Sequence, residues 1–117
     1  MPDSIVLDDI VGGGWRHRAF EPFRDGIEIC HVLAGEPAVA ILRYSPGATV
    51  PPHEHVGLET VMILEGSQRD DNGVYGAGTV ILNREGSRHA VASDEGCVVL
   101  IQWAKPIRFL GDDAAGA

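Results

Sequence analysis

Two histidines one residue apart, His53 and His55, and a glutamate four residues later, Glu59, have the types and spacing of metal ligands. In an extended strand, residues i and i+2 point to the same side, so the two imidazoles project together. Glu59 has the same parity and joins them if the turn at residues 56–58 preserves it. Two imidazoles and a carboxylate on one face form a partial site for a divalent metal. The alternative is a set of surface polar residues beside the bend at Pro51-Pro52, because His-x-His pairs also arise by chance.

A second segment, residues 78–89, offers another strand, a glycine turn and a single histidine, His89. Together the two segments resemble the two signature motifs of the cupin superfamily, the RmlC-like jelly rolls. The first motif is matched at all of its fixed positions, which are Gly47, His53, His55, Glu59 and Gly66. The second is matched at Gly78, Gly86 and His89, whereas Arg84 replaces the usual proline and Ser93 the usual asparagine.

This resemblance implies an all-β fold, a single-domain cupin jelly-roll β-barrel. It also implies that His53, His55, Glu59 and His89 bind one divalent transition metal, which the ligand set allows to be Fe, Zn, Mn or Ni. The two departures from the second motif affect turn and loop chemistry and leave the ligand set complete.

Length and composition agree with one small β domain. The chain has 117 residues, 15 of them Gly and 7 Pro, which indicates short strands separated by turns. Its net charge of −8 disfavours nucleic acid and anionic membranes as partners. Cys30 and Cys97 each lie beside apolar residues and are expected to be buried thiols. Because the N-terminus lacks the pattern of a signal peptide, we expect a cytoplasmic protein.

The order of strand and turn signals divides the chain into three parts. We expect an N-terminal arm over residues 1–14 with one edge strand, the cupin barrel over 15–110, and a flexible tail over 111–117. Asp70 to Gly73 carries an Asn-Gly hairpin signal. Residues 60–64 are apolar on both faces, so one face should fill the barrel and the other should contact a second sheet or subunit. A homodimer is therefore predicted.

The sequence of the core is similar to that of one subgroup, the ChrR-like cupins. This subgroup is named after the metal-binding C-terminal domain of a bacterial anti-sigma factor. The similarity spans residues 15 to 105 and is carried by residues 42–48, His53-x-His55-x-Gly57-x-Glu59, and residues 64–67, 71–78 and 93–97. Only 14 residues precede Trp15, so we do not expect the sigma-binding domain of that protein in this chain. Other stand-alone relatives in the subgroup act as dioxygenases on small diketones.

Three functions remain open from the sequence. The first is a metal-dependent, Fe-type dioxygenase that binds a small diketone or related oxygenated molecule at the metal; with zinc, Lewis-acid polarisation is the alternative chemistry. The second is a non-catalytic sensor or small-molecule-binding module, and the third is a metal that only stabilises the fold. Tyr44, Arg43 and Gln102 are the candidate substrate-orienting residues. Tyr44 and Arg43 face opposite ways, so only one of them should point into the barrel.

Overall fold

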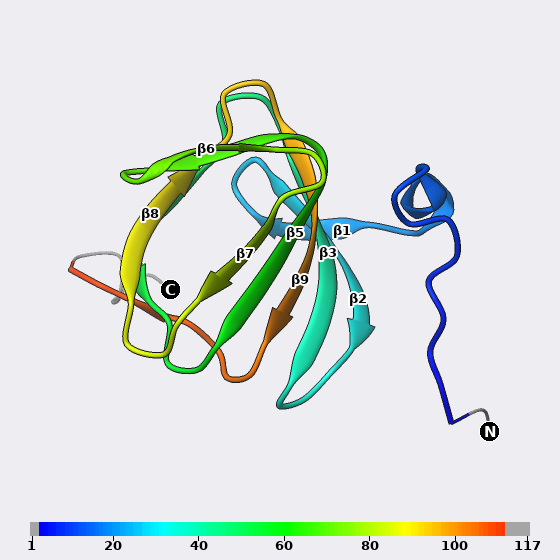
Figure 1. Cartoon of the computed structure of the whole chain (residues 1–117), viewed down its shortest axis with the longest axis horizontal. Helices are drawn as coiled ribbons and strands as arrows, with labels where there is room; N and C mark the ends of the chain where they lie inside the picture. The colour runs from blue at the N-terminus through cyan, green and yellow to red at the C-terminus, as the bar shows by residue number, and fades with distance from the viewer. Residues whose placement is uncertain (1–2, 112–117) are drawn as a thin grey trace.

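The computed structural model describes residues 3–111, which form a short 3₁₀ helix followed by ten β-strands (Figure 1). The elements are η1 (Gly14–His17), β1 (Glu21–Arg24), β2 (Ile27–Leu33), β3 (Ala38–Tyr44), β4 (Thr49–Glu54), β5 (Glu59–Asp70), β6 (Gly73–Gly76), β7 (Val80–Asn83), β8 (Arg88–Ala92), β9 (Cys97–Trp103) and β10 (Arg108–Phe109). The predicted all-β cupin jelly roll is confirmed.

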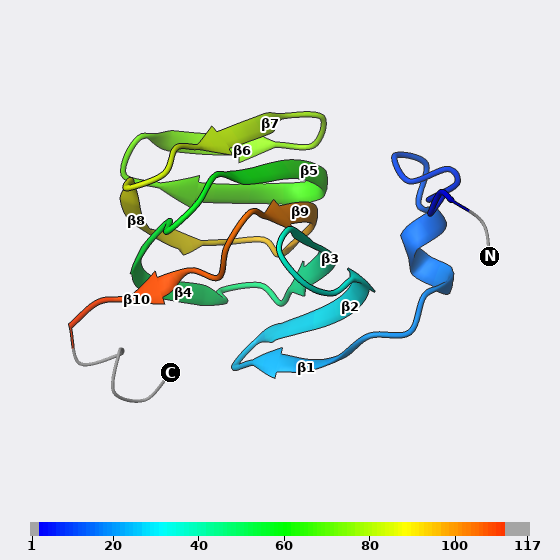
Figure 2. The same ribbon diagram turned by 90° about the horizontal axis from the view of Figure 1, so that it is seen from below.

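The strands are joined in the order β1-β2-β3-β9-β5-β8-β4-β10, and β6 and β7 each pair with β5. All of these pairings are antiparallel. The 12-residue strand β5 reaches from β9 and β7 at its start to β6 and β8 at its end. The sheet therefore curls so that β4 and β8 form one side and β3 and β9 the other (Figures 1 and 2).

The middle of the sheet is apolar on both faces, as predicted for residues 60–64. The inner face of the sheet carries a buried apolar cluster that includes Val61, Ile63, Val99 and Ile101. On the outer face, Trp15 of η1 packs in a cluster with Cys30, Ile41, Leu64 and Val98. Part of the second apolar face is thus covered by the chain's own N-terminal segment.

The tight turns follow the glycine and Asn-Gly signals. β5 and β6 form the predicted hairpin, with Asp70 opposite Gly73. Gly66 has φ +73°, and a Cβ at this position would collide with the carbonyl oxygen of Gly96. This close approach requires glycine, and it lets β5 bend where the pairing with β9 shifts register.

The sequence predicted an edge strand near the N-terminus and a flexible tail at the C-terminus. Residues 3–13 of the N-terminal arm form turns and irregular backbone and contain no strand, so the predicted edge strand is wrong for that range. The flexible tail predicted over 111–117 lies, apart from Gly111, outside the described residues. No helix between residues 3 and 111 has the length and apolar character needed to cross a membrane.

Candidate metal centre

The pairing of β4 with β8 places His53 directly opposite His89. His55 lies just beyond β4, where its backbone N–H donates to Ser87 O and its carbonyl accepts from Gly86 N–H. The three ligand atoms lie within 4.8 Å of one another. The ring centroid of His53 lies 5.1 Å from that of His55 and 4.7 Å from that of His89. The structure therefore brings together three of the four predicted ligands.

Each of the three imidazoles is oriented through its Nδ1 atom. His53 donates from Nδ1–H to Pro51 O at 2.8 Å. His89 donates from Nδ1–H to Asp70 Oδ2 at 3.0 Å. Nδ1–H of His55 donates to Ser87 Oγ at 2.9 Å, because that hydroxyl already donates its own proton to Arg84 O. The proton on each ring is thus held at Nδ1, and the lone pair of each Nε2 is free.

The free Nε2 atoms fit a metal ion. Nε2 of His55 and of His89 are buried and have no hydrogen-bond partner among the described residues. An unpaired buried acceptor is costly unless a ligand satisfies it. Burial also lowers the pKa of His53, although its hydrogen bond to Pro51 acts in the opposite direction. A neutral imidazole is the form that binds a metal. The donor set therefore suits a divalent transition metal.

Glu59 lies beside the histidine cluster and is held by two donors. Its Oε2 accepts from Trp103 Nε1 at 2.8 Å, and its Oε1 accepts from Asn83 Nδ2 at 2.9 Å. Both partners sit directly opposite Glu59 in the sheet, one on β9 and one on β7. Oε1 is also 3.4 Å from Nε2 of His55, a spacing at which both atoms could bind one ion. Glu59 is outside the tightest histidine group, so its ligand role stays a prediction.

The charge state of Glu59 suits this position. Burial alone would raise the pKa of the carboxyl, but its hydrogen-bonding neighbours outweigh this effect, so the pKa lies below its ordinary value. The carboxylate is therefore ionised at neutral pH and contributes one negative charge to the site.

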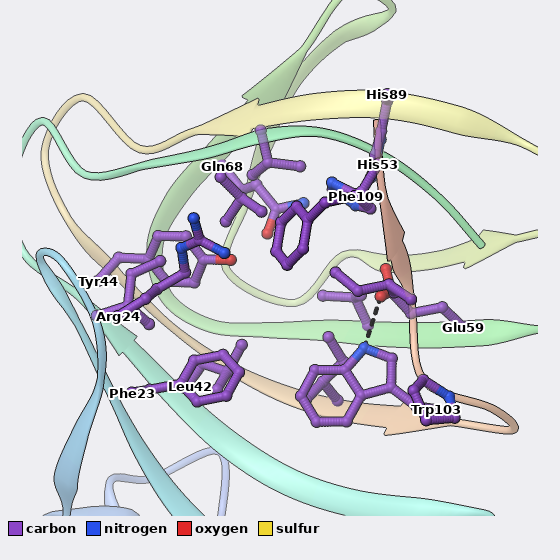
Figure 3. Close-up of a pocket in the computed structure, with 17 residues that line it drawn as sticks. Phe23, Arg24, Leu42, Tyr44, His53, Glu59, Gln68, His89, Trp103 and Phe109 are labelled. Carbon is purple, nitrogen blue, oxygen red and sulfur yellow. Dashed lines mark hydrogen bonds between the residues drawn. The ribbon is translucent and has the colours of Figure 1, made fainter. Parts of the chain in front are cut away.

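His53 and His89 border a cavity of about 440 Å³ inside the barrel (Figure 3). This size suits a small organic molecule. Its lining is mostly apolar and comprises Phe23, Arg24, Ile27, Leu42, Tyr44, Val50, His53, Glu59, Val61, Gln68, His89, Val91, Ile101, Trp103, Pro106, Ile107 and Phe109. A ligand in this cavity would therefore lie against His53, His89 and Glu59.

Of the three predicted substrate-orienting residues, only Tyr44 lines this cavity. Burial raises the pKa of its phenol far above the ordinary value, so the hydroxyl stays protonated. Arg43 points to the opposite face, where it binds Glu28 at 2.9 Å and lies over Phe20. Gln102 also does not line the cavity, because its strand neighbours Ile101 and Trp103 take the inward positions. We therefore withdraw Arg43 and Gln102 as substrate-orienting residues.

Four supporting residues were missed by the sequence reasoning, namely Asp70, Ser87, Asn83 and Trp103. Asp70 was interpreted only as part of a hairpin turn, yet its side chain is 5% exposed and binds His89. Asn83 and Ser87 lie within the segment 78–89 that was singled out for His89, but the local pattern assigned no role to either. The contacts of Trp103 and Asp70 depend on the pairing of strands that are distant in sequence.

Replacing a ligand should abolish metal binding. We expect His53→Ala, His55→Ala, Glu59→Ala and His89→Ala each to lower metal affinity by far more than the roughly 10–100-fold typical of outer-shell changes. Elemental mass spectrometry and chelator competition on the purified variants measure this loss. His31→Ala is the matched control, because His31 is exposed and lies outside the cluster. A full metal load in His89→Ala would refute the assignment.

Asp70 should tune the site without binding the metal. We expect Asp70→Asn to lower metal affinity by roughly 10–100-fold, because His89 loses the charged acceptor that holds its Nδ1 proton. Chelator competition measures the affinity, and Asp71→Asn, at the adjacent exposed carboxylate, is the control. Equal affinities in the two variants would contradict this role.

Comparison with known proteins agrees with the fold. Residues 15–105 match the ChrR Cupin-like domain family. The chain is 30% identical over 106 residues to the anti-sigma-E factor ChrR of Cereibacter sphaeroides, covering 88% of this chain and 50% of that protein. The chain thus spans about half the length of this curated relative.

Solved structures share the architecture. A chain in the crystal structure of Rhodobacter sphaeroides SigE in complex with the anti-sigma ChrR superposes with a TM-score of 0.71 at 26% identity, covering 81% of this chain and 54% of that one. An acetylacetone dioxygenase from Acinetobacter johnsonii superposes with a TM-score of 0.77 at 15% identity, covering 97% and 81%, and at this identity the likeness concerns the fold alone. The chain belongs to the ChrR cupin-like domain family.

Proposed function

We propose that this protein is a metal-dependent dioxygenase that acts on a small diketone or a related oxygenated molecule. The observation that carries the proposal is the position of the histidine cluster: His53 and His89 border an apolar cavity of about 440 Å³. A metal that only stabilises the fold needs no such cavity beside it. The acetylacetone dioxygenase likeness supports the proposal at the level of the fold.

The chain's own residues would prepare the site in three ways. Trp103 and Asn83 hold the Glu59 carboxylate in one orientation. The mostly apolar walls exclude water and strengthen electrostatic contacts within the cavity. Tyr44 presents a neutral hydroxyl that can donate to a substrate oxygen. When bound at the histidines, a divalent metal would supply Lewis acidity for an enolate oxygen and, in the case of iron, reactivity toward O₂.

Iron-loaded protein should consume O₂ in the presence of a suitable 1,3-diketone. We expect uptake in an oxygen electrode with a panel of small diketones, together with cleavage products detected by mass spectrometry. The His89→Ala variant and the metal-free protein should give no uptake, because both lack a complete site. A fully iron-loaded protein that leaves every diketone intact would contradict the dioxygenase assignment.

The alternative is a non-catalytic module that binds a small molecule at the metal. The 30% identity to an anti-sigma-E factor favours this alternative, since an anti-sigma factor has a regulatory role. Ligand binding to the metal-loaded protein without turnover would select this function.

The environment of the cysteines disfavours a redox role for them, because Cys30 and Cys97 are both buried and burial raises the pKa of Cys97 to about 11.

We further propose that the protein is a homodimer. Strand β7 pairs only with β5 among residues 3–111, and its side chains Val80 and Leu82 are 55% and 63% exposed. An exposed apolar edge strand is a natural place for a second copy to pair. A cytoplasmic location stays a prediction from the lack of a signal-peptide pattern, and the absence of a nucleic-acid partner stays a prediction from the negative charge.

Light scattering coupled to size-exclusion chromatography tests the dimer. We expect twice the chain mass of 12.5 kDa for the natural sequence and a single chain mass for Val80→Lys/Leu82→Lys. Leu33→Lys is the control, because Leu33 is 43% exposed on a different strand. A monomeric natural protein, or an unchanged dimer in the double variant, would refute this interface.

A further inference from the structure

The cavity has a second polar region away from Glu59, formed by Arg24, Tyr44 and Gln68 (Figure 3). Arg24 is the last residue of β1 and Tyr44 the last residue of β3, whereas Gln68 lies near the end of β5. In Figure 3, Arg24 and Tyr44 lie beside each other on one side of the cavity, and Glu59 and Trp103 lie on the other. The cavity thus offers different chemistry at its two sides.

The Arg24 guanidinium lacks an anionic partner in the described part of the chain. Five other arginines form an ion pair with a carboxylate, namely Arg16, Arg43, Arg69, Arg88 and Arg108. Arg18 and Arg84 form none among the described residues either, but unlike Arg24 they do not line the cavity. Arg24 forms no ion pair or hydrogen bond of this kind within residues 3–111, and instead lies 4.5 Å from the centre of the Phe109 ring. Arg24 is half-buried, and the cation–π contact leaves its hydrogen-bond donors free to bind water or a ligand.

Gln68 and Tyr44 reinforce the same pattern. Gln68 is only 3% exposed and Tyr44 only 7%, and both line the cavity. Neither side chain makes a hydrogen bond to another described residue, and their polar atoms are not fully enclosed by protein, so they open onto the cavity. Two neutral donors therefore face the same space as an unpaired guanidinium. The natural complement is a ligand with a negative charge and several acceptor atoms.

We propose that Arg24, Gln68 and Tyr44 form a carboxylate-binding subsite, so that the substrate is a small oxo acid whose carboxylate lies at Arg24. The diketone part of such a substrate would lie toward the histidines, and this part of the inference rests on the proposed function. Arg24 is the group that determines charge specificity, because a guanidinium binds a carboxylate with two parallel hydrogen bonds. Gln68 and Tyr44 add neutral donors to the carboxylate oxygens.

A matched pair of probes tests the subsite. The carboxylate 4,6-dioxoheptanoate and its neutral methyl ester carry the same 1,3-diketone, and their affinities for zinc-loaded protein can be compared by calorimetry. We expect the carboxylate to bind about 10- to 100-fold more tightly than the ester, as charge-assisted hydrogen bonds imply. Arg24→Leu should remove this difference and leave the ester affinity nearly unchanged. Arg24→Lys should keep part of it, because the charge remains without the paired geometry.

Arg43→Leu is the matched control, since Arg43 lies on the opposite face of the sheet and binds Glu28. Circular dichroism checks that each variant is folded. The titrations are repeated in Asp112→Asn/Asp113→Asn, because these two carboxylates lie outside the described residues and follow Phe109 closely in the sequence. The subsite is supported if the preference for the carboxylate over the ester is the same in the natural sequence and in Asp112→Asn/Asp113→Asn. It is supported further if Arg24→Leu abolishes this preference.

A further arm separates this subsite from the proposed activity. Pentanoate, which has no diketone, should bind the metal-free protein and lose affinity in Arg24→Leu, whether or not the iron-loaded protein turns over a diketone. The inference is overturned if the carboxylate and the ester bind with equal affinity to both the natural sequence and Asp112→Asn/Asp113→Asn. It is also overturned if Arg24→Leu does not change the affinity for the carboxylate. Tight binding of inorganic phosphate with no binding of carboxylates would overturn the assignment to an oxo acid.

Discussion

The backbone pairing of β4 with β8 is the constraint on which the rest of this structure depends. It places His53 opposite His89 although the two residues are far apart in sequence, and the 86–87 turn that leads into β8 also holds His55. Because the same hydrogen bonds form the barrel wall and align the imidazoles, a shift in register would destroy both. The site therefore needs no separate scaffold.

Glu59 connects this wall to the centre of the sheet. The carboxylate takes its two donors from the residues directly opposite it on β7 and β9, so three adjacent strands fix its position. Such outer contacts hold a buried charge at lower cost than an unpaired carboxylate would incur. In the same cavity, Arg24 carries a charge whose partner the described chain does not supply. We attribute this contrast to different roles of the two residues: Glu59 stabilises the site itself, whereas Arg24 is available to pair with a ligand.

Much of the fold and part of the site could be predicted from local spacing. The i, i+2 relation of His53 and His55 follows from periodicity, and the shared motif extended the site to His89. Parity showed that Arg43 and Tyr44 diverge, but not which one faces inward. Gln102 was misplaced because β9 is apolar on both faces, which removes the alternation that would orient it. The roles of Asp70 and Trp103 depend on registers between distant strands, which no local pattern encodes.

The central claim is that the clustered histidines bind a metal in the natural protein. It is tested most directly by elemental mass spectrometry of the protein purified anaerobically from its own host. The account predicts about one equivalent of a divalent transition metal per chain, as a single site with this donor set implies. Iron or manganese would direct attention to oxygen chemistry, and zinc to the binding module. Protein that is folded and free of metal under these conditions would contradict the account.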